Sequence, residues 1–150
     1  MLMERKPIII LMADDDDDDY QLTRDAFEEH RIASLLYRVR DGEELMDYLL
    51  RRDRYKYPEQ SPRPDLILLD LNMPKKDGRE ALAEIKKHPD LKKIPVVILT
   101  VSELDDDIDR AYDLGASSYI KKPEKFNQLV DVVKVLKRYW LEIVQLPISE

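Results

Sequence analysis

The chain contains no cysteine in its 150 residues, which excludes disulfides, thiolate metal sites and thiol nucleophiles. Its two histidines, His30 and His88, are too few for a histidine-rich metal site. No stretch approaches the ~20 consecutive apolar residues that a membrane span requires. The charged start at residues 1–6 has no long apolar segment behind it, as a signal peptide would. We therefore expect a cytoplasmic protein without a membrane partner.

Charge and length narrow the remaining classes of protein. The net charge of −7 argues against a nucleic-acid partner, because nonspecific binding depends on neutralising phosphates with Lys and Arg. At 150 residues we expect a single domain covering residues 1–150. Its core is expected at about 7–136, with an extended C-terminal helix and tail at about 124–150.

The hydrophobic pattern alternates between strand-like and helix-like segments. Three apolar runs predict buried strands and two weaker runs predict shorter or edge strands: residues 8–13, 66–69 and 96–99, then 36–39 and 118–121. Five amphipathic segments predict helices: residues 18–30, 42–52, 77–87, 104–114 and 124–144. This alternation specifies an α/β fold, a doubly wound five-stranded parallel sheet with helices on both faces. At this length we expect the flavodoxin-like strand order 2-1-3-4-5.

The most informative segment is residues 66–78, in which four apolar residues run directly into Asp70. Pro74 and Gly78 follow and turn the chain into a helix. An acid at the carboxyl end of a buried strand lies where open parallel sheets place their chemistry. Asp70 is therefore the strongest candidate for a functional residue.

Other polar residues follow the remaining central strands. Because the carboxyl ends of parallel strands meet at one edge, these groups should converge with Asp70: Asp14 and Asp15 after the first strand, Thr100 after the fourth and Lys122 after the fifth. Carboxylates packed together repel each other, and a divalent cation relieves that repulsion. An all-oxygen ligand set with room for phosphate oxygens suits Mg²⁺.

This arrangement suits phosphoryl transfer to a carboxylate. The metal and Lys122 would neutralise the charge on the transferred oxygens while the Asp70 oxygen attacks in line. Thr100 could then donate a hydrogen bond to the acyl phosphate.

The residues from Asp70 to Gly78, with the groups after the other strands, resemble the receiver domains of two-component response regulators (CheY-like). The resemblance implies that Asp70 is the phosphoacceptor. It also implies that Asp14, Asp15, Asp70 and the backbone carbonyl of Asn72 bind Mg²⁺. Such a protein is not an enzyme acting on other substrates, and it catalyses only its own phosphorylation and dephosphorylation.

The resemblance also assigns the groups that respond to phosphorylation. Thr100 and Lys122 would bind the phosphoryl group, and Tyr119, three residues before that lysine, would be the aromatic switch. The peptide bond before Pro123 is commonly cis in this family.

Within the family, the Pro-rich loop before residue 65, residues 72–80 and the ending at 139–147 resemble single-domain regulators that partner phytochrome-type histidine kinases. The resemblance implies a stand-alone receiver, phosphorylated by a sensor histidine kinase, that signals through protein contacts.

Two apolar stripes on the last predicted helix indicate a homodimer. One has the spacing of a core-facing stripe: Leu129, Val133, Leu136, Trp140 and Val144. A second lies alongside it: Val132, Val135, Tyr139, Ile143 and Leu146. Together they exceed what a surface helix needs to bury, so a partner should cover the excess. The alternative is that the tail folds back over its own domain.

Some alternatives remain open. In the six-residue run Asp14–Asp19, the metal-binding pair could be Asp15 and Asp16, and at least one of Asp16 to Asp18 should cap the following helix. The protein could be a pseudo-receiver that binds partners without phosphorylation. A haloacid-dehalogenase-like phosphatase would also use Mg²⁺ and an aspartyl phosphate, but it would require an acid at position 72, which is Asn.

Overall fold

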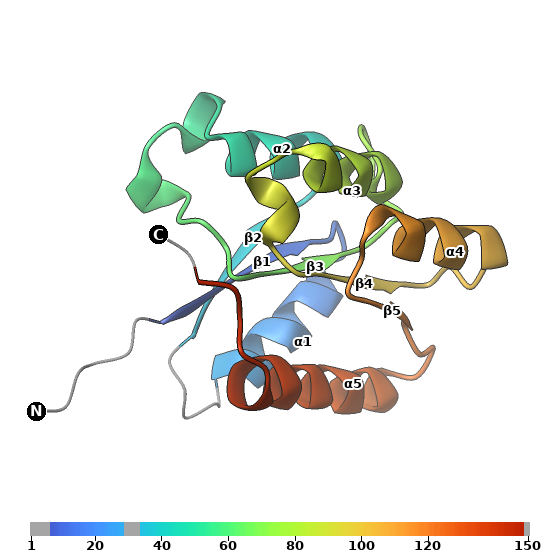
Figure 1. Ribbon diagram of the computed structural model, residues 1–150. Helices are drawn as coiled ribbons and strands as arrows, with labels where there is room; N and C mark the ends of the chain where they lie inside the picture. The colour runs from blue at the N-terminus through green and yellow to red at the C-terminus, as the bar shows by residue number, and fades with distance from the viewer. Residues whose placement is uncertain (1–6, 29–33, 149–150) are drawn as a thin grey trace, which may run out of the picture.

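The computed structural model describes residues 7–28 and 34–148 and contains one parallel sheet (Figure 1). The strands pair in the order β2-β1-β3-β4-β5, which confirms the predicted topology. Their bounds are β1 Ile8–Ala13, β2 Ser34–Val39, β3 Leu66–Leu69, β4 Val96–Thr100 and β5 Ser118–Lys121. The buried strands β1, β3 and β4 are close to the predicted ranges, and β2 begins two residues earlier than the predicted 36–39.

Helices cover both faces of this sheet. Helices α1 and α5 lie on one face, and α2, α3 and α4 lie on the other (Figure 1). Their bounds are α1 Asp17–Glu28, α2 Gly42–Leu50, α3 Gly78–Lys87, α4 Asp105–Leu114 and α5 Phe126–Arg138. Residues 29–30 of the first predicted helix lie outside the described part. Among residues 7–28 and 34–148, no helix has both the length and the apolar character to cross a membrane.

Aspartates fix the beginnings of three helices. Asp41 accepts a hydrogen bond from the backbone N–H of Glu44 at 2.7 Å, and Asp77 accepts from that of Arg79 at 2.9 Å. Asp16 does the same at α1, accepting from the N–H of Asp19 at 3.0 Å. These carboxylates satisfy helical N–H groups that have no partner within the helix. The acidic run is therefore part of an ordered helix start.

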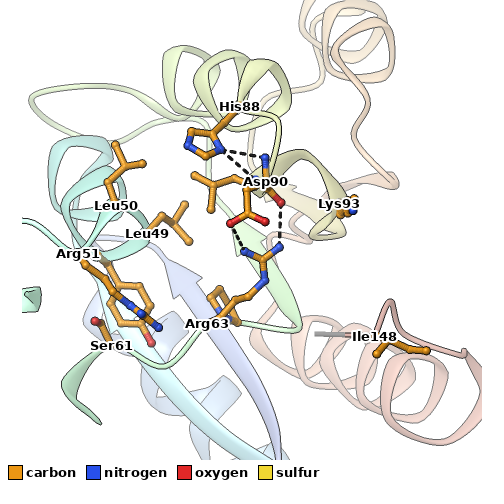
Figure 2. A pocket seen from close by; sticks show the side chains of 12 residues that line it. Leu49, Leu50, Arg51, Ser61, Arg63, His88, Asp90, Lys93 and Ile148 are labelled. Atoms are coloured by element: carbon orange, nitrogen blue, oxygen red, sulfur yellow. Dashed lines mark hydrogen bonds and ion pairs between the residues drawn. The ribbon is translucent and has the colours of Figure 1, made fainter. Parts of the chain in front are cut away.

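A hollow of about 750 Å³ lies between the C-terminal ends of α2 and α3, at the amino edge of the sheet (Figure 2). Arg51, Arg63 and Lys93 line it, and the Arg63 guanidinium donates to Asp90 Oδ2 at 3.1 Å and to the Asp90 carbonyl at 2.8 Å. Cations at helix C-termini offset the negative end of the helix dipole. We therefore interpret these basic groups as structural.

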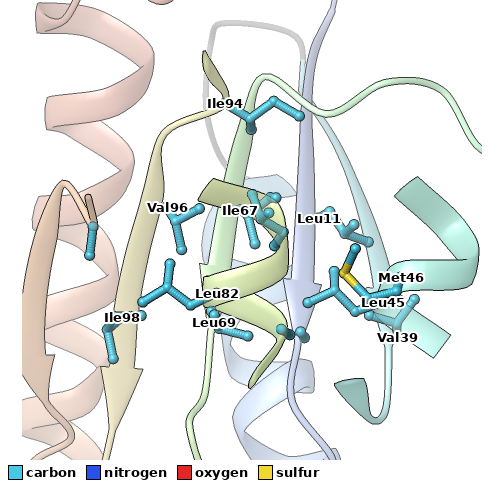
Figure 3. Packing of buried hydrophobic residues seen from close by; sticks show 14 of the residues in the cluster. Leu11, Val39, Leu45, Met46, Ile67, Leu69, Leu82, Ile94, Val96 and Ile98 are labelled. Atoms are coloured by element: carbon cyan, nitrogen blue, oxygen red, sulfur yellow. The ribbon is translucent and has the colours of Figure 1, made fainter. Parts of the chain in front are cut away.

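The core has two layers, one on each face of the sheet, because side chains alternate along each strand. Leu11 and Ala13 of β1 face the layer under α2 and α3, whereas Ile10 and Met12 face α1 and α5. Figure 3 shows the first layer, where side chains from neighbouring strands meet those of α2 and α3. Double-sided burial explains why the central strands have continuous apolar sequences.

The end of α5 departs from the predicted continuous helix. A π-helical turn, Tyr139–Ile143, follows Arg138, and the chain is extended from Val144. Val144 and Leu146 pack against the layer under α1 and α5, so the tail does fold back over its own domain in part. The exposed remainder of the second stripe is Val135, Tyr139 and Ile143, at 68%, 47% and 59%.

Candidate functional site

The carboxyl edge of the sheet brings together the polar residues predicted from the sequence. Asp14, Asp70, Thr100 and Lys122 are all buried there, each 8% exposed or less. Backbone hydrogen bonds hold them in register: Asp70 N–H donates to the Ala13 carbonyl at 3.0 Å, and Lys122 N–H to that of Thr100 at 2.7 Å. Buried polar groups require partners, and this cluster supplies its own.

The two oxygens of the Asp70 carboxylate have different partners. Oδ1 accepts from the Thr100 hydroxyl at 2.7 Å and from the backbone N–H of Asn72 at 3.1 Å. Oδ2 lies 3.4 Å from Lys122 Nζ. Gly78 packs tightly against the end of β3. A Cβ at this position would lie only 2.2 Å from the Asp70 carbonyl oxygen. Only glycine therefore allows α3 to begin directly against the strand that carries Asp70.

Lys122 is held mainly by two other carboxylates. Its Nζ donates to Asp14 Oδ2 at 2.7 Å and to Asp19 Oδ2 at 2.8 Å. Burial alone would lower the pKa of Lys122, but attraction by Asp14 and Asp70 and the hydrogen bonds to Asp14 and Asp19 outweigh it. The pKa of Lys122 therefore lies above its ordinary value, and the ammonium stays protonated.

Asp14 is the carboxylate that burial perturbs most clearly. Burial, aided by the nearby charge of Asp70, raises the pKa of Asp14 to about 6 against the lowering effect of Lys122. An acid that is this costly to ionise favours a compensating cation. One carboxylate oxygen each from Asp14, Asp15 and Asp70 lies within 4.8 Å of the other two. These three carboxylates fit an oxygen-ligated divalent ion, with the exposed Asp15 leaving a side open to solvent.

The next two aspartates of the run have other partners. The Asp16 carboxylate caps α1, while its N–H donates to Asp14 Oδ1 at 2.9 Å. Asp17 pairs with Arg38 at 2.8 Å and with Arg40 at 3.1 Å. This geometry favours Asp14 and Asp15 as the metal-binding pair over Asp15 and Asp16.

Sequence reasoning missed Arg38 and Asp19. The Arg38 side chain is 10% exposed, its Nε–H donates to the Asp14 carbonyl at 3.0 Å, and its guanidinium lies 4.8 Å from the centre of the Tyr20 ring. Arg38 thereby ties the end of β2 to the acidic loop. The available signal was an arginine near the end of a predicted strand, where burial would demand a nearby anion.

Tyr119, the predicted aromatic switch, contacts the loop that follows Thr100. The Tyr119 hydroxyl donates to the Ser102 carbonyl at 2.9 Å, which ties this half-buried ring to the loop.

No cis peptide bond occurs in the described residues, so the expected cis bond before Pro123 is corrected to trans. The trans form is intrinsically preferred even before proline, and Lys122 reaches its carboxylates with it.

Arg79 and Asp107 clamp that loop to α3. Arg79 Nε and Nη2 each donate to Asp107 at 2.7 Å, and the Ser102 hydroxyl donates to the same carboxylate at 2.6 Å. The hydrogen bond from Arg79, followed by that from Ser102, lowers the pKa of Asp107 to about 2. Two parallel hydrogen bonds from a guanidinium to one carboxylate are stronger than hydrogen bonds between neutral groups.

Asp107→Asn should therefore destabilise the fold at neutral pH by about 1.5 kcal/mol, a typical value for hydrogen bonds to a charged group. Because folding depresses the Asp107 pKa, its stabilisation is present above about pH 4 and is lost as the pH falls towards 2. Urea denaturation at several pH values should show the difference between variant and wild type shrinking over that range. Asp106→Asn is the control, and equal effects of both variants would contradict the assignment.

Comparison with known proteins agrees with this geometry. Residues 10–134 match the response regulator receiver domain family. Response regulator Rcp1 of Synechocystis sp. is 46% identical over 129 residues, 86% of each chain. The crystal structure of Mn²⁺-bound Rcp1 matches with a TM-score of 0.90 and 44% identity, covering 95% of this chain and 100% of that one. The phosphorylated cyanobacterial phytochrome response regulator RcpA matches with the same TM-score, coverage of 95% and 100%, and 43% identity. The chain therefore belongs to the receiver domain family of two-component response regulators.

Proposed function

We propose that Asp70 accepts a phosphoryl group from a sensor histidine kinase and that the protein then signals through protein contacts. The observation that carries this proposal is the placement of Thr100 and Lys122 at opposite oxygens of one buried carboxylate. The donor's phosphorus–nitrogen bond would break as the Asp70 oxygen–phosphorus bond forms, and the electron pair returns to the donor imidazole. The kinase is proposed to be phytochrome-type, because RcpA is a phytochrome response regulator. A cytoplasmic location follows from the same proposal.

The proposed metal is Mg²⁺, with Asp14, Asp15, Asp70 and the Asn72 carbonyl as ligands. Three carboxylates facing one lysine leave excess negative charge, which supports a cation at this position. Bound Mg²⁺ would neutralise charge on the transferred oxygens. Lys122 would supply a second positive charge, and Thr100 would donate its hydroxyl hydrogen to the phosphoryl group instead of to Asp70. Tyr119 would respond as the switch, because its hydroxyl donates to Ser102 in the loop that follows Thr100 and would follow a shift of that loop.

The rival functions have less support. A pseudo-receiver would not need Asp70, Thr100 and Lys122 in mutual contact. An aspartyl-phosphate phosphatase would need an acid at position 72, and Asn72 instead lies with its Oδ1 3.4 Å from the Arg79 guanidinium.

Intact mass spectrometry tests the proposed function. In Mg²⁺ and acetyl phosphate, the wild-type mass should rise by one phosphate, and EDTA should prevent the increase. No increase under saturating Mg²⁺ and donor would favour the pseudo-receiver.

We also propose a homodimer built on the end of α5, and its test is a change in oligomeric state. Exposed Val135, Tyr139 and Ile143 form an apolar strip that a second copy could cover. Tyr139→Glu with Ile143→Glu should convert a micromolar dimer into a folded monomer in sedimentation. The matched control, Leu104→Glu with Tyr112→Glu, changes similarly exposed residues near α4 and should remain dimeric. A wild-type monomer at all accessible concentrations would contradict the dimer.

A further inference from the structure

The six consecutive aspartates occupy different environments, although their side chains are identical. Asp14 and Asp15 belong to the carboxylate cluster with Asp70, Asp16 caps α1, and Asp17 pairs with arginines. Asp18 is exposed. Asp19 is different again, because its carboxylate turns back from the first turn of α1 to the ammonium of Lys122.

The contact between Asp19 and Lys122 is closer than that between Lys122 and Asp70. Lys122 Nζ lies 2.8 Å from Asp19 Oδ2 but 3.4 Å from Asp70 Oδ2. The Asp19 side chain is 22% exposed and that of Lys122 is 6% exposed, so water screens this pair only weakly. The N–H of Asp19 is fixed by the Asp16 cap at 3.0 Å, which holds the Asp19 backbone in place.

An ammonium group has three N–H donors, and two of those of Lys122 point to Asp14 and Asp19. Under the proposed function, Asp14 and Asp70 are metal ligands. Of the three carboxylates that contact Lys122, Asp19 is then the one outside the proposed ligand set. It would determine where Lys122 rests in the metal-loaded, unphosphorylated protein.

We propose that Asp19 is a positioning residue that draws the Lys122 ammonium towards α1 and competes with the incoming phosphoryl group for it. This inference rests on the proposed function of Asp70. Asp19 makes phosphorylation less favourable, because Lys122 must exchange a charge-assisted hydrogen bond to Asp19 for one to a phosphoryl oxygen. The balance between these two partners sets the affinity of the site for a phosphoryl group.

The test measures beryllofluoride binding, as a phosphoryl mimic, in saturating Mg²⁺ by calorimetry. Asp19→Asn should bind beryllofluoride at least about fivefold more tightly than wild type, which corresponds to about 1 kcal/mol at 1.4 kcal/mol per tenfold. Asp18→Asn removes the same charge from the same helical turn and should change the affinity less than about twofold. In a Lys122→Met background, Asp19→Asn should lose its effect.

A spectroscopic measurement separates positioning from a general structural effect. With ¹⁵N-labelled lysine and Mg²⁺, Asp19→Asn should shift the Lys122 ammonium signal before beryllofluoride is added, whereas Asp18→Asn should not. Equal affinities of the two variants, or an Asp19→Asn effect that persists without Lys122, would overturn the inference. A loss of Mg²⁺ affinity in Asp19→Asn would also overturn it by placing Asp19 on the metal. If wild type binds Mg²⁺ but not beryllofluoride, the proposed function fails and the inference fails with it.

Discussion

Asp70→Asn is expected to take up no phosphoryl group under conditions in which the wild type is fully labelled. An amide oxygen is a far weaker nucleophile than a carboxylate, whereas asparagine keeps the size of the side chain and can still accept from Thr100. Removing one charge from the crowded site should also raise the metal-free melting temperature, since Asp70 raises the cost of ionising Asp14.

Intact mass and thermal unfolding measure both effects. Asp18→Asn serves as the control for the loss of one exposed aspartate and should be labelled like wild type. An Asp70→Asn variant labelled to the wild-type extent would show that another acid is the acceptor.

Lys122→Met should be the most destabilising substitution at the site, by about 3 kcal/mol in metal-free buffer. Removing one partner of a buried ion pair leaves an uncompensated buried charge. Here it leaves Asp14 and Asp70 facing each other. Mg²⁺ should restore part of the lost stability, because a bound cation replaces the missing positive charge and stabilises by mass action.

Urea denaturation with and without Mg²⁺ gives the two free energies of unfolding. The control is Lys121→Met, because that lysine is 43% exposed and its pair with Glu103 lies at the surface. Surface pairs contribute little, so its effect should be small beside that of Lys122→Met. Equal destabilisation by the two substitutions would contradict the proposed role of Lys122.

The fold could be predicted well from the sequence because burial leaves a direct pattern. Strands buried on both faces have continuous apolar runs, as in Leu66–Leu69. The half-exposed β2 has a weaker pattern, and its first two residues were missed. The end of α5 was not predictable from periodicity, because apolar spacing does not distinguish a continuing helix from a π turn followed by a tail packed on the core.

The site was predictable only where the sheet itself dictates position. Asp70, Thr100 and Lys122 converge because parallel strands end at one edge. Asp19 and Arg38 act through side chains that cross between elements, and spacing along the chain contains no such information. The cis bond before Pro123 came from the family resemblance alone, and the chain departs from it.

The most direct test of the central claim is chemical localisation of the phosphoryl group. Borohydride reduces an aspartyl phosphate to homoserine, so reduction of the labelled protein followed by peptide mapping identifies the acceptor. The account predicts homoserine at position 70 alone, in amounts that depend on Mg²⁺. Homoserine within Asp14–Asp19, or none in protein that carries a phosphate, would contradict it.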